Sequence, residues 1–407
     1  MNLDTYSDIK FEKRESCAIC NSPLGTPLIE YPSFPLTEIY VEDKITDKLG
    51  FVDQALHYCD NCGFGQLENI IDPKVLYNDT YKTRTTGSSA MGAIDVFLNF
   101  IDNNLDENQI DNIVEIGCND TYTLSKLKHR ANNLFGIDPI LKGREQEFQD
   151  ENITTFGDFF ENVDLNEIGK KLDVVISSHT LEHISDPKSL IKKTLDKADS
   201  KTQFFFQFPG LELLIDNARF DQIHHQHYNY FTVDSVVHML AELDAELINY
   251  EFNPHHWGAL MIYFKRKSNN SLNKYENVDI SRQYINKDRI LNQYNLFLDS
   301  MDLANRRILS YSDKKIYGFG AALMLPLLAY YINDFNKLDS ILDDDESKNH
   351  LYYLNLPIQI KNPTSIENLK DNVIFVTGLN SRSVLRSITA RLIDLGVRDI
   401  IIPTNLF

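Results

Sequence analysis

Four of the five cysteines form two pairs with the same spacing, Cys17-x-x-Cys20 and Cys59-x-x-Cys62. A tight turn with this spacing presents two thiolates to one tetrahedral zinc ion. Disulfide bonds are the alternative, but the doubled spacing favours zinc. Because all four ligands are cysteines, the site would be closed and structural, with no open coordination position for catalysis. Residues 1–75 are therefore predicted to form a zinc-binding module with a scaffold role.

Histidines form the second group of reactive side chains. The stretch FDQIHHQHYNYF, residues 220–231, contains His224, His225 and His227, with Gln226 between them. Packing explains three such close imidazoles poorly, so the stretch indicates proton transfer. A metal cluster is the alternative, although adjacent histidines suit a metal less well than pairs four residues apart.

A second histidine pair, His179 and His183, does have the four-residue spacing. The two side chains could share one face if this segment is helical, which would allow a metal site. The sequence places no third ligand beside them, so a metal site is not favoured here.

Residues 112–138 have the pattern of a strand, a tight turn, a helix and a second strand that ends in an acid. Gly117 ends an apolar strand that contains Glu115, and the next helix is expected to begin near Thr121. Asp138 follows the turn by about 20 residues, where a carboxylate can accept both hydroxyl groups of a ribose. The pattern predicts a nucleoside site with Glu115, Gly117, Asn119, Asp120 and Asp138.

The turn lacks G-x-G-x-x-G, so a pyrophosphate has no obvious seat. Its E-x-G-x-N-D sequence instead resembles the nucleoside loop of methyltransferases, which bind S-adenosylmethionine. In that fold, Asp158 lies in the strand-end loop that commonly contacts the adenine amino group, and His179 follows the fourth strand beside the cofactor. An ordinary strand–helix–strand unit with a satisfied acid remains the alternative.

The segments that must position these groups predict an α/β fold. Strands near residues 113–116, 134–137, 153–156, 172–178, 203–208, 246–252 and 260–265 would form the seven-stranded sheet of a class I methyltransferase. We expect a methyltransferase domain over residues 76–268, a helical bridge over 269–312 and a Rossmann-like α/β domain over 313–407. A helix is also expected near 141–149, and another after the GDFF sequence at 157–160.

Composition narrows the function further. The chain has 407 residues and a formal net charge of −19, which argues against nucleic acid as the main partner, since affinity for nucleic acid comes from Lys and Arg. No apolar stretch is long enough to span a bilayer, and the first residues have no signal-peptide core. We therefore expect a cytoplasmic protein that does not bind membranes.

The order of these parts resembles a family across nearly the whole chain: the S-adenosylmethionine-dependent sugar C-methyltransferases that act on nucleotide-linked 4-keto-deoxysugars. The resemblance implies structural zinc, S-adenosylmethionine and a nucleotide-sugar substrate. It also implies that a base removes a proton beside the keto group and that the enolate attacks the methyl group. His227 would be the base, while His183 and Tyr81 would position or polarise the sugar.

Three positions depart from the family pattern. Gln226 replaces a glutamate beside the expected base, Thr121 replaces a glycine in the nucleoside loop, and Met261 replaces an arginine. Two other functions therefore stay open. One is methyl transfer to oxygen or nitrogen of a related sugar or small metabolite, and the other is nucleoside binding or assembly without catalysis.

Overall fold

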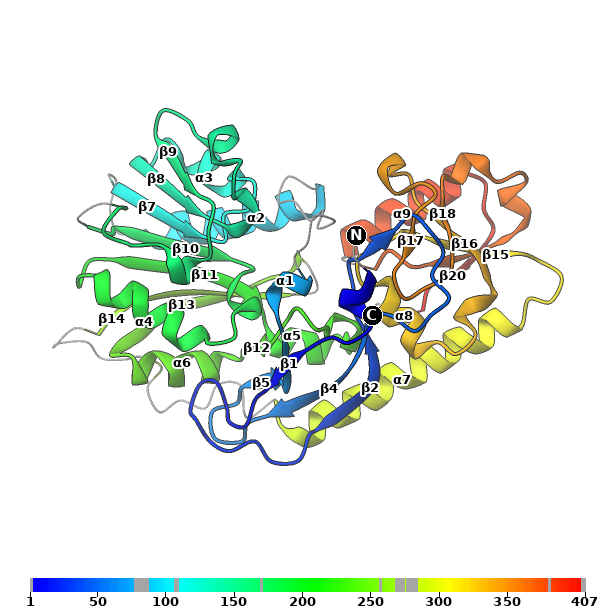
Figure 1. The fold of residues 1–407 in the computed structure, drawn as a ribbon, viewed down its shortest axis with the longest axis horizontal. Coiled ribbons are helices and arrows are strands. Elements are labelled where there is room, and N and C mark those ends of the chain that lie inside the picture. Colours follow the sequence, from blue (N-terminus) through cyan, green and yellow to red (C-terminus); the bar gives the residue numbers. More distant parts are fainter. Residues whose placement is uncertain are drawn as a thin grey trace.

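The computed structural model describes residues 3–76, 88–105, 110–168, 171–255, 258–267, 275, 285–379 and 382–403. Its largest sheet has seven strands and lies on the opposite side of the molecule from the C-terminal sheet (Figure 1). Its strand order is β13 (Ala245–Asn253), β14 (Ala259–Arg266), β11 (Gln203–Pro209), β10 (Val174–Ser178), β7 (Ile110–Ile116), β8 (Ala131–Ile137) and β9 (Ile153–Phe156). Strand β14 is antiparallel to both neighbours, and the other pairings are parallel. The predicted seven-stranded class I fold is confirmed.

Helices cover both faces of this sheet, which explains why almost every residue of its central strands β10 and β11 is buried. Helices α2 (Ser88–Asn104) and α3 (Tyr122–Leu127) pack on one face. Helices α4 (Pro187–Lys197) and α6 (Val233–Glu242) pack on the other. Asp186 caps α4 through its side chain, and Thr232 begins α6 with a capping box, so local sequence fixes where both helices start.

Two expected helices are wrong in the fully described stretch 139–168. In place of a helix near 141–149 there are two short 3-10 turns, η2 (Pro139–Leu141) and η3 (Glu145–Phe148), separated by Gly143 at φ +76°. The segment after GDFF contains only the 3-10 turn η4 (Phe160–Asn162). The 3-10 turns suffice in the first of these segments because it joins two neighbouring strands, β8 and β9.

The C-terminal sheet has five parallel strands, as a Rossmann-like unit requires. Their order is β18 (Ile360–Lys361), β16 (Leu338–Leu342), β15 (Ile316–Phe319), β19 (Val373–Val376) and β20 (Asp399–Ile401). Helices α8 (Leu325–Tyr331) and α9 (Arg382–Asp394) belong to this unit. The long helix α7 (Lys287–Leu309) runs from beneath the N-terminal strands to the C-terminal sheet (Figure 1).

The N-terminal residues contribute strands to sheets shared with the rest of the chain. Their main sheet has the order β12 (Asn229–Tyr230), β5 (Gly65–Leu67), β4 (Phe51–Tyr58) and β2 (Ile29–Pro35). The short strands β1 (Phe11–Lys13) and β6 (Asn69–Ile71) pair with each other. A further pair joins β3 (Tyr40–Val41) to β17 (Tyr352–Tyr353). The module is therefore bound to both α/β units, and the domain boundaries themselves stay a prediction.

Among the helices that the structure describes, none is both long and apolar enough to cross a membrane.

Candidate active site and zinc-binding module

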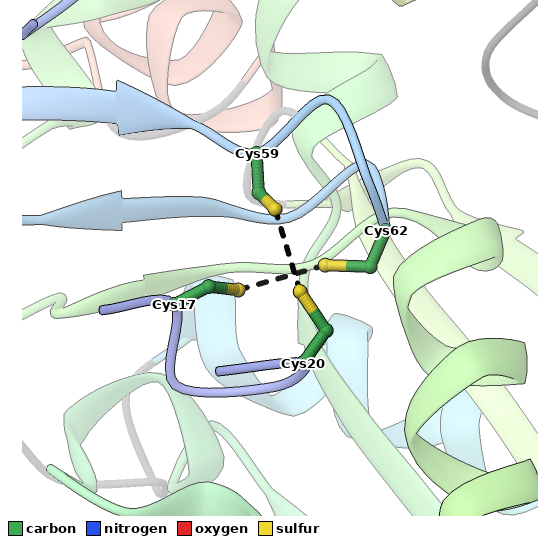
Figure 2. Close-up of side chains that lie close together, drawn as sticks. All are labelled: Cys17, Cys20, Cys59 and Cys62. Atoms are coloured by element: carbon green, nitrogen blue, oxygen red, sulfur yellow. Dashed lines mark hydrogen bonds between the residues drawn. The ribbon is translucent and has the colours of Figure 1, made fainter. Parts of the chain in front are cut away.

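The four cysteines of the two C-x-x-C pairs converge on one point (Figure 2). The Sγ atoms of Cys17 and Cys62 are 3.6 Å apart, and those of Cys20 and Cys59 are 3.5 Å apart. Thiolates about 2.3 Å from a central zinc ion have separations close to these, so the donor set fits tetrahedral zinc. The predicted ligand set is thus brought together by the fold.

Both cysteine turns have the same backbone geometry. The N–H groups of Asn21 and Gly63 donate to the carbonyl oxygens of Cys17 and Cys59 at 2.9 and 2.8 Å. Each donor residue closes its turn in the left-handed region, with φ of 57° for Asn21 and 77° for Gly63. Glycine and asparagine tolerate this conformation best, which explains both residue types.

A cavity of about 1180 Å³ lies against the carboxyl ends of β7, β8 and β10. Its wall also includes Tyr40 from the N-terminal module and residues 321–324 from the C-terminal unit. All three parts of the chain therefore enclose one space, large enough for a cofactor together with a small-molecule substrate.

At the cofactor end, Gly117 and Asp138 have the positions expected of the nucleoside loop. Gly117 has φ of 77°, and a Cβ atom there would lie 1.9 Å from Thr180 Oγ1, so only glycine fits. The Asp138 carboxylate accepts the backbone N–H of Asn119 at 2.8 Å and that of Ile140 at 3.0 Å. These bonds hold the turn and the strand-end acid together at the cavity wall, where both Asn119 and Asp138 lie.

Glu115 also lines the cavity, but its carboxyl group is buried. Burial raises the pKa of this carboxyl to about 8, so it holds a proton in neutral solution. A neutral carboxyl group can donate a hydrogen bond as well as accept one, so Glu115 can act as a donor at the predicted nucleoside site.

Two other expected cofactor residues do not line the cavity. Asp158 is half-buried, and its carboxylate accepts from the backbone N–H of Phe159 and from the Asn162 amide, both at 2.8 Å. Asp120 lies beside the turn, where its carboxylate is 3.4 Å from the Tyr122 backbone nitrogen. The residue preceding α3 is Thr121, whose side chain makes no capping hydrogen bond.

The N-terminal module holds the histidine-rich segment in place. His225 is buried, with Nε2 at 3.1 Å from the carbonyl oxygen of Phe34. The Gln226 amide oxygen accepts from the hydroxyl of Thr37 at 3.1 Å, and the hydroxyl of Tyr228 donates to the carbonyl oxygen of Ile71 at 2.7 Å. His225 and Gln226 thus serve as anchors, and neither lines the cavity.

His183 and His227 face each other at the cavity wall. Their ring centroids are 4.8 Å apart in an edge-to-face arrangement, and the rings of His224 and His227 are 3.9 Å apart. Nδ1 of His183 lies 2.8 Å from the backbone oxygen of Gln226. His179, His183, His224 and His227 all contribute to the cavity lining.

Burial and the surrounding imidazoles keep His224 and His227 neutral. Burial, together with His183 and His225, lowers the pKa of His224 to about 3. Burial, together with His224, His183 and His179, lowers the pKa of His227 well below its ordinary value. A neutral imidazole that lines a cavity can accept a proton, which is the chemistry expected of His227.

Sequence reasoning missed Glu182, a buried acid between the histidines of the 179–183 segment. Its Oε1 lies 3.1 Å from His179 Nδ1. The one signal for Glu182 in the sequence is its position next to His183 in a strand-end loop. Tyr81, the remaining expected site residue, lies outside the described residues.

Comparison with known proteins agrees with this geometry. Residues 92–250 match the model described as "Methyltransferase domain", and residues 17–77 match "Putative zinc binding domain". The C-methyltransferase NovU of Streptomyces niveus is 20% identical over 259 residues, which cover 61% of this chain and 60% of that protein. The match therefore spans less than two thirds of that relative.

Solved structures that resemble the chain include the N-methyltransferase NodS of Bradyrhizobium japonicum WM9 in complex with S-adenosylhomocysteine. It is 14% identical, with a TM-score of 0.36, over 47% of this chain and 94% of NodS. An S-adenosylmethionine-dependent methyltransferase of Mesorhizobium loti is 15% identical, with a TM-score of 0.33, over 44% of this chain and 99% of that protein.

The sheet order and the first match define the class: the chain carries a class I S-adenosylmethionine-dependent methyltransferase domain. It is joined to a zinc-binding module whose ligands are the four clustered cysteines. S-adenosylmethionine and zinc are the cofactors of these two parts.

Proposed function

We propose that this protein transfers a methyl group from S-adenosylmethionine to a carbon atom of a nucleotide-linked keto-deoxysugar. The observation that carries the proposal is the shared cavity, which is lined at one end by Asn119 and Asp138 and further along by His183 and His227. The relative NovU is named a C-methyltransferase, which supports carbon as the acceptor.

In this mechanism His227 removes the proton next to the substrate carbonyl group. Its imidazole lines the cavity and is neutral, as a base must be before it accepts a proton. S-adenosylmethionine, when bound, supplies an activated methyl group on a sulfonium. Attack on that group needs alignment alone, so the chain's task is to hold donor and acceptor in line.

The test uses purified full-length protein with methyl-¹³C S-adenosylmethionine and a panel of nucleotide-linked 4-keto-deoxysugars. NMR of the product identifies the atom that carries the labelled carbon. We expect a carbon–carbon bond, together with solvent-deuterium exchange at the carbon next to the ketone. A labelled methyl group on oxygen or nitrogen would contradict the proposal and favour the alternative transfer reaction.

The His227→Asn variant should bind S-adenosylmethionine with unchanged affinity but lose the deuterium exchange. His129→Asn is the matched control, because His129 is exposed and lies outside the cavity lining. Binding of the cofactor by wild-type protein without turnover of any member of the panel would favour the non-catalytic function.

A further inference from the structure

Glu182 lies on the 3-10 turn η5 (Leu181–His183), and its side chain is fully buried beside the histidine cluster. Its Oε1 is 3.1 Å from Nδ1 of His179 and 4.0 Å from Nε2 of His183. Within the described part of the chain, its Oε2 has no hydrogen-bond partner. A buried carboxylate is costly without a nearby positive charge, and the groups able to supply one here are imidazoles.

The hydrogen bond to Gln226 determines which nitrogen of His183 carries the proton in the neutral ring. A backbone carbonyl oxygen can only accept, so the His183 Nδ1–H donates to Gln226 over 2.8 Å. In the neutral imidazole, Nε2 is then without a proton and faces Glu182 Oε1. While Nε2 has no proton, it and Glu182 Oε1 are both hydrogen-bond acceptors. Once Nε2 is protonated, it becomes a positively charged donor that faces a carboxylate, so Glu182 stabilises the charged form of His183.

His227 has different surroundings. A nitrogen of its ring lies within 4.8 Å of a Glu182 carboxylate oxygen, whereas His183 Nε2 lies 4.0 Å from Glu182 Oε1. The other titratable groups near the His227 ring are the imidazoles of His179, His183 and His224 and the phenol of Tyr230. Burial and the three imidazoles all oppose a positive charge on His227. A proton taken up by His227 would therefore be held more weakly than one on His183, whose ring lies 4.8 Å away.

We infer that Glu182 is a positioning residue that stabilises on His183 the proton that His227 takes from the substrate. This inference rests on the proposed function. The substrate C–H bond breaks and its electron pair forms the enolate, while the proton passes through His227 to His183 Nε2. The enolate then forms a bond to the methyl carbon as the carbon–sulfur bond breaks, and the thioether leaves without charge.

The first experiment measures the order of protonation in the wild-type, zinc-loaded, full-length protein. Histidine labelled with ¹³C allows each imidazole to be titrated by NMR, with His183→Asn and His227→Asn identifying the two signals. We expect His183 to bind its proton at least tenfold more tightly than His227, a difference of at least one pKa unit. Equal values or the reverse order would overturn the inference.

The second experiment uses Glu182→Gln, which keeps the size of the side chain and removes its charge. The proton affinity of His183 should fall at least tenfold, while exposed His129 stays unchanged as the internal reference. An unchanged His183 titration in Glu182→Gln would show a purely structural role.

These titrations need no substrate, so they distinguish failure of this inference from failure of the proposed function. If methyl transfer is observed, Glu182→Gln should lower kcat and leave the affinity for S-adenosylmethionine unchanged. Should Glu182→Gln fail to fold, the wild-type order of protonation still decides the question.

Discussion

The backbone N–H of Tyr228 donates to the carbonyl oxygen of Glu182 at 2.8 Å, which joins the two histidine-bearing segments directly. Immediately after Tyr228 the chain forms β12, whose Asn229 pairs with Gln66 on the strand that follows the second cysteine pair. Arg14, near the first pair, donates to the carbonyl oxygens of Tyr228 and Ser185 at 3.1 and 2.6 Å. The zinc-binding module therefore supports the geometry of the histidine cluster.

Loss of zinc should consequently abolish the reaction without removing the cofactor site. Cys62→Ser is expected to lower the zinc content from one ion per chain toward none and to reduce thermal stability, because metal binding contributes to folding. S-adenosylmethionine should still bind, since Gly117 and Asp138 belong to the other sheet. Metal analysis, thermal unfolding and calorimetric titration check these outcomes.

The matched control is Cys118→Ala, which removes the cysteine that lies outside the cluster. It should retain one zinc ion per chain. A zinc content unchanged in Cys62→Ser would contradict the four-cysteine site.

Gly117→Ala should weaken S-adenosylmethionine binding at least tenfold. The added Cβ atom would lie 1.9 Å from Thr180 Oγ1, at a backbone φ of 77°. Gly143→Ala has nearly the same φ of 76° but meets no atom within 4 Å, so it separates backbone strain from the clash. We expect both variants to lose about 1 kcal/mol of stability from strain, and only Gly117→Ala to lose cofactor affinity. Equal affinities in calorimetric titration would refute this assignment.

Thr121→Gly should stabilise the protein by about 1 kcal/mol, because left-handed backbone is unfavourable for a β-branched residue. Thr121 has φ of 59° and ψ of 16° just before α3. Thr121→Ala keeps a Cβ atom and should give no such gain. Urea unfolding of the three proteins measures the difference, and a gain in Thr121→Ala alone would point to the side chain instead of the backbone.

Glu115 should make the protein less stable as the solution becomes alkaline. Burial raises the pKa of its carboxyl to about 8 in the folded state, so the folded protein binds this proton more tightly than the unfolded chain does. The resulting stabilisation is complete below the ordinary glutamate pKa of about 4.3 and is lost as the pH rises to about 8.

Glu115→Gln removes this titration. The free energy of unfolding of the wild type, relative to the variant, should therefore fall by up to about 1.4 kcal/mol per pH unit across that interval. Urea unfolding at pH 5, 7 and 9 provides the test. A difference between the two proteins that does not vary with pH would show that Glu115 is already ionised in the folded state.

Much of this architecture can be predicted because its signals are local. The apolar runs of β7 and β10, the Asp186–Pro187 start of α4 and the cysteine spacing each depend on neighbouring residues. The expected helix near 141–149 failed because apolar residues in short connections can satisfy the sheet core through 3-10 turns. Leu141 is buried in that core although it lies in a 3-10 turn, so its apolar side chain fits the pattern of a helix where none forms.

The candidate site was only partly predictable, because its geometry depends on contacts between distant segments. His183 and His227 could be selected by residue type, but their edge-to-face arrangement results from the fold. Nothing in the sequence distinguishes buried Glu182 from an exposed acid, or shows that Asp158 turns toward Asn162. Such pairings arise from loop packing, which has no periodic pattern.

The pairing of β12 with β5 has a consequence for synthesis on the ribosome. The cysteine turns and β4 emerge early, and zinc can bind them before the methyltransferase sheet exists. The outer edge of β5 cannot be paired until Asn229 and Tyr230 have emerged far downstream. Until then the free edge of β5 is exposed to other nascent chains and can aggregate with them. Pairing with β12, which belongs to the histidine-rich segment, covers this edge.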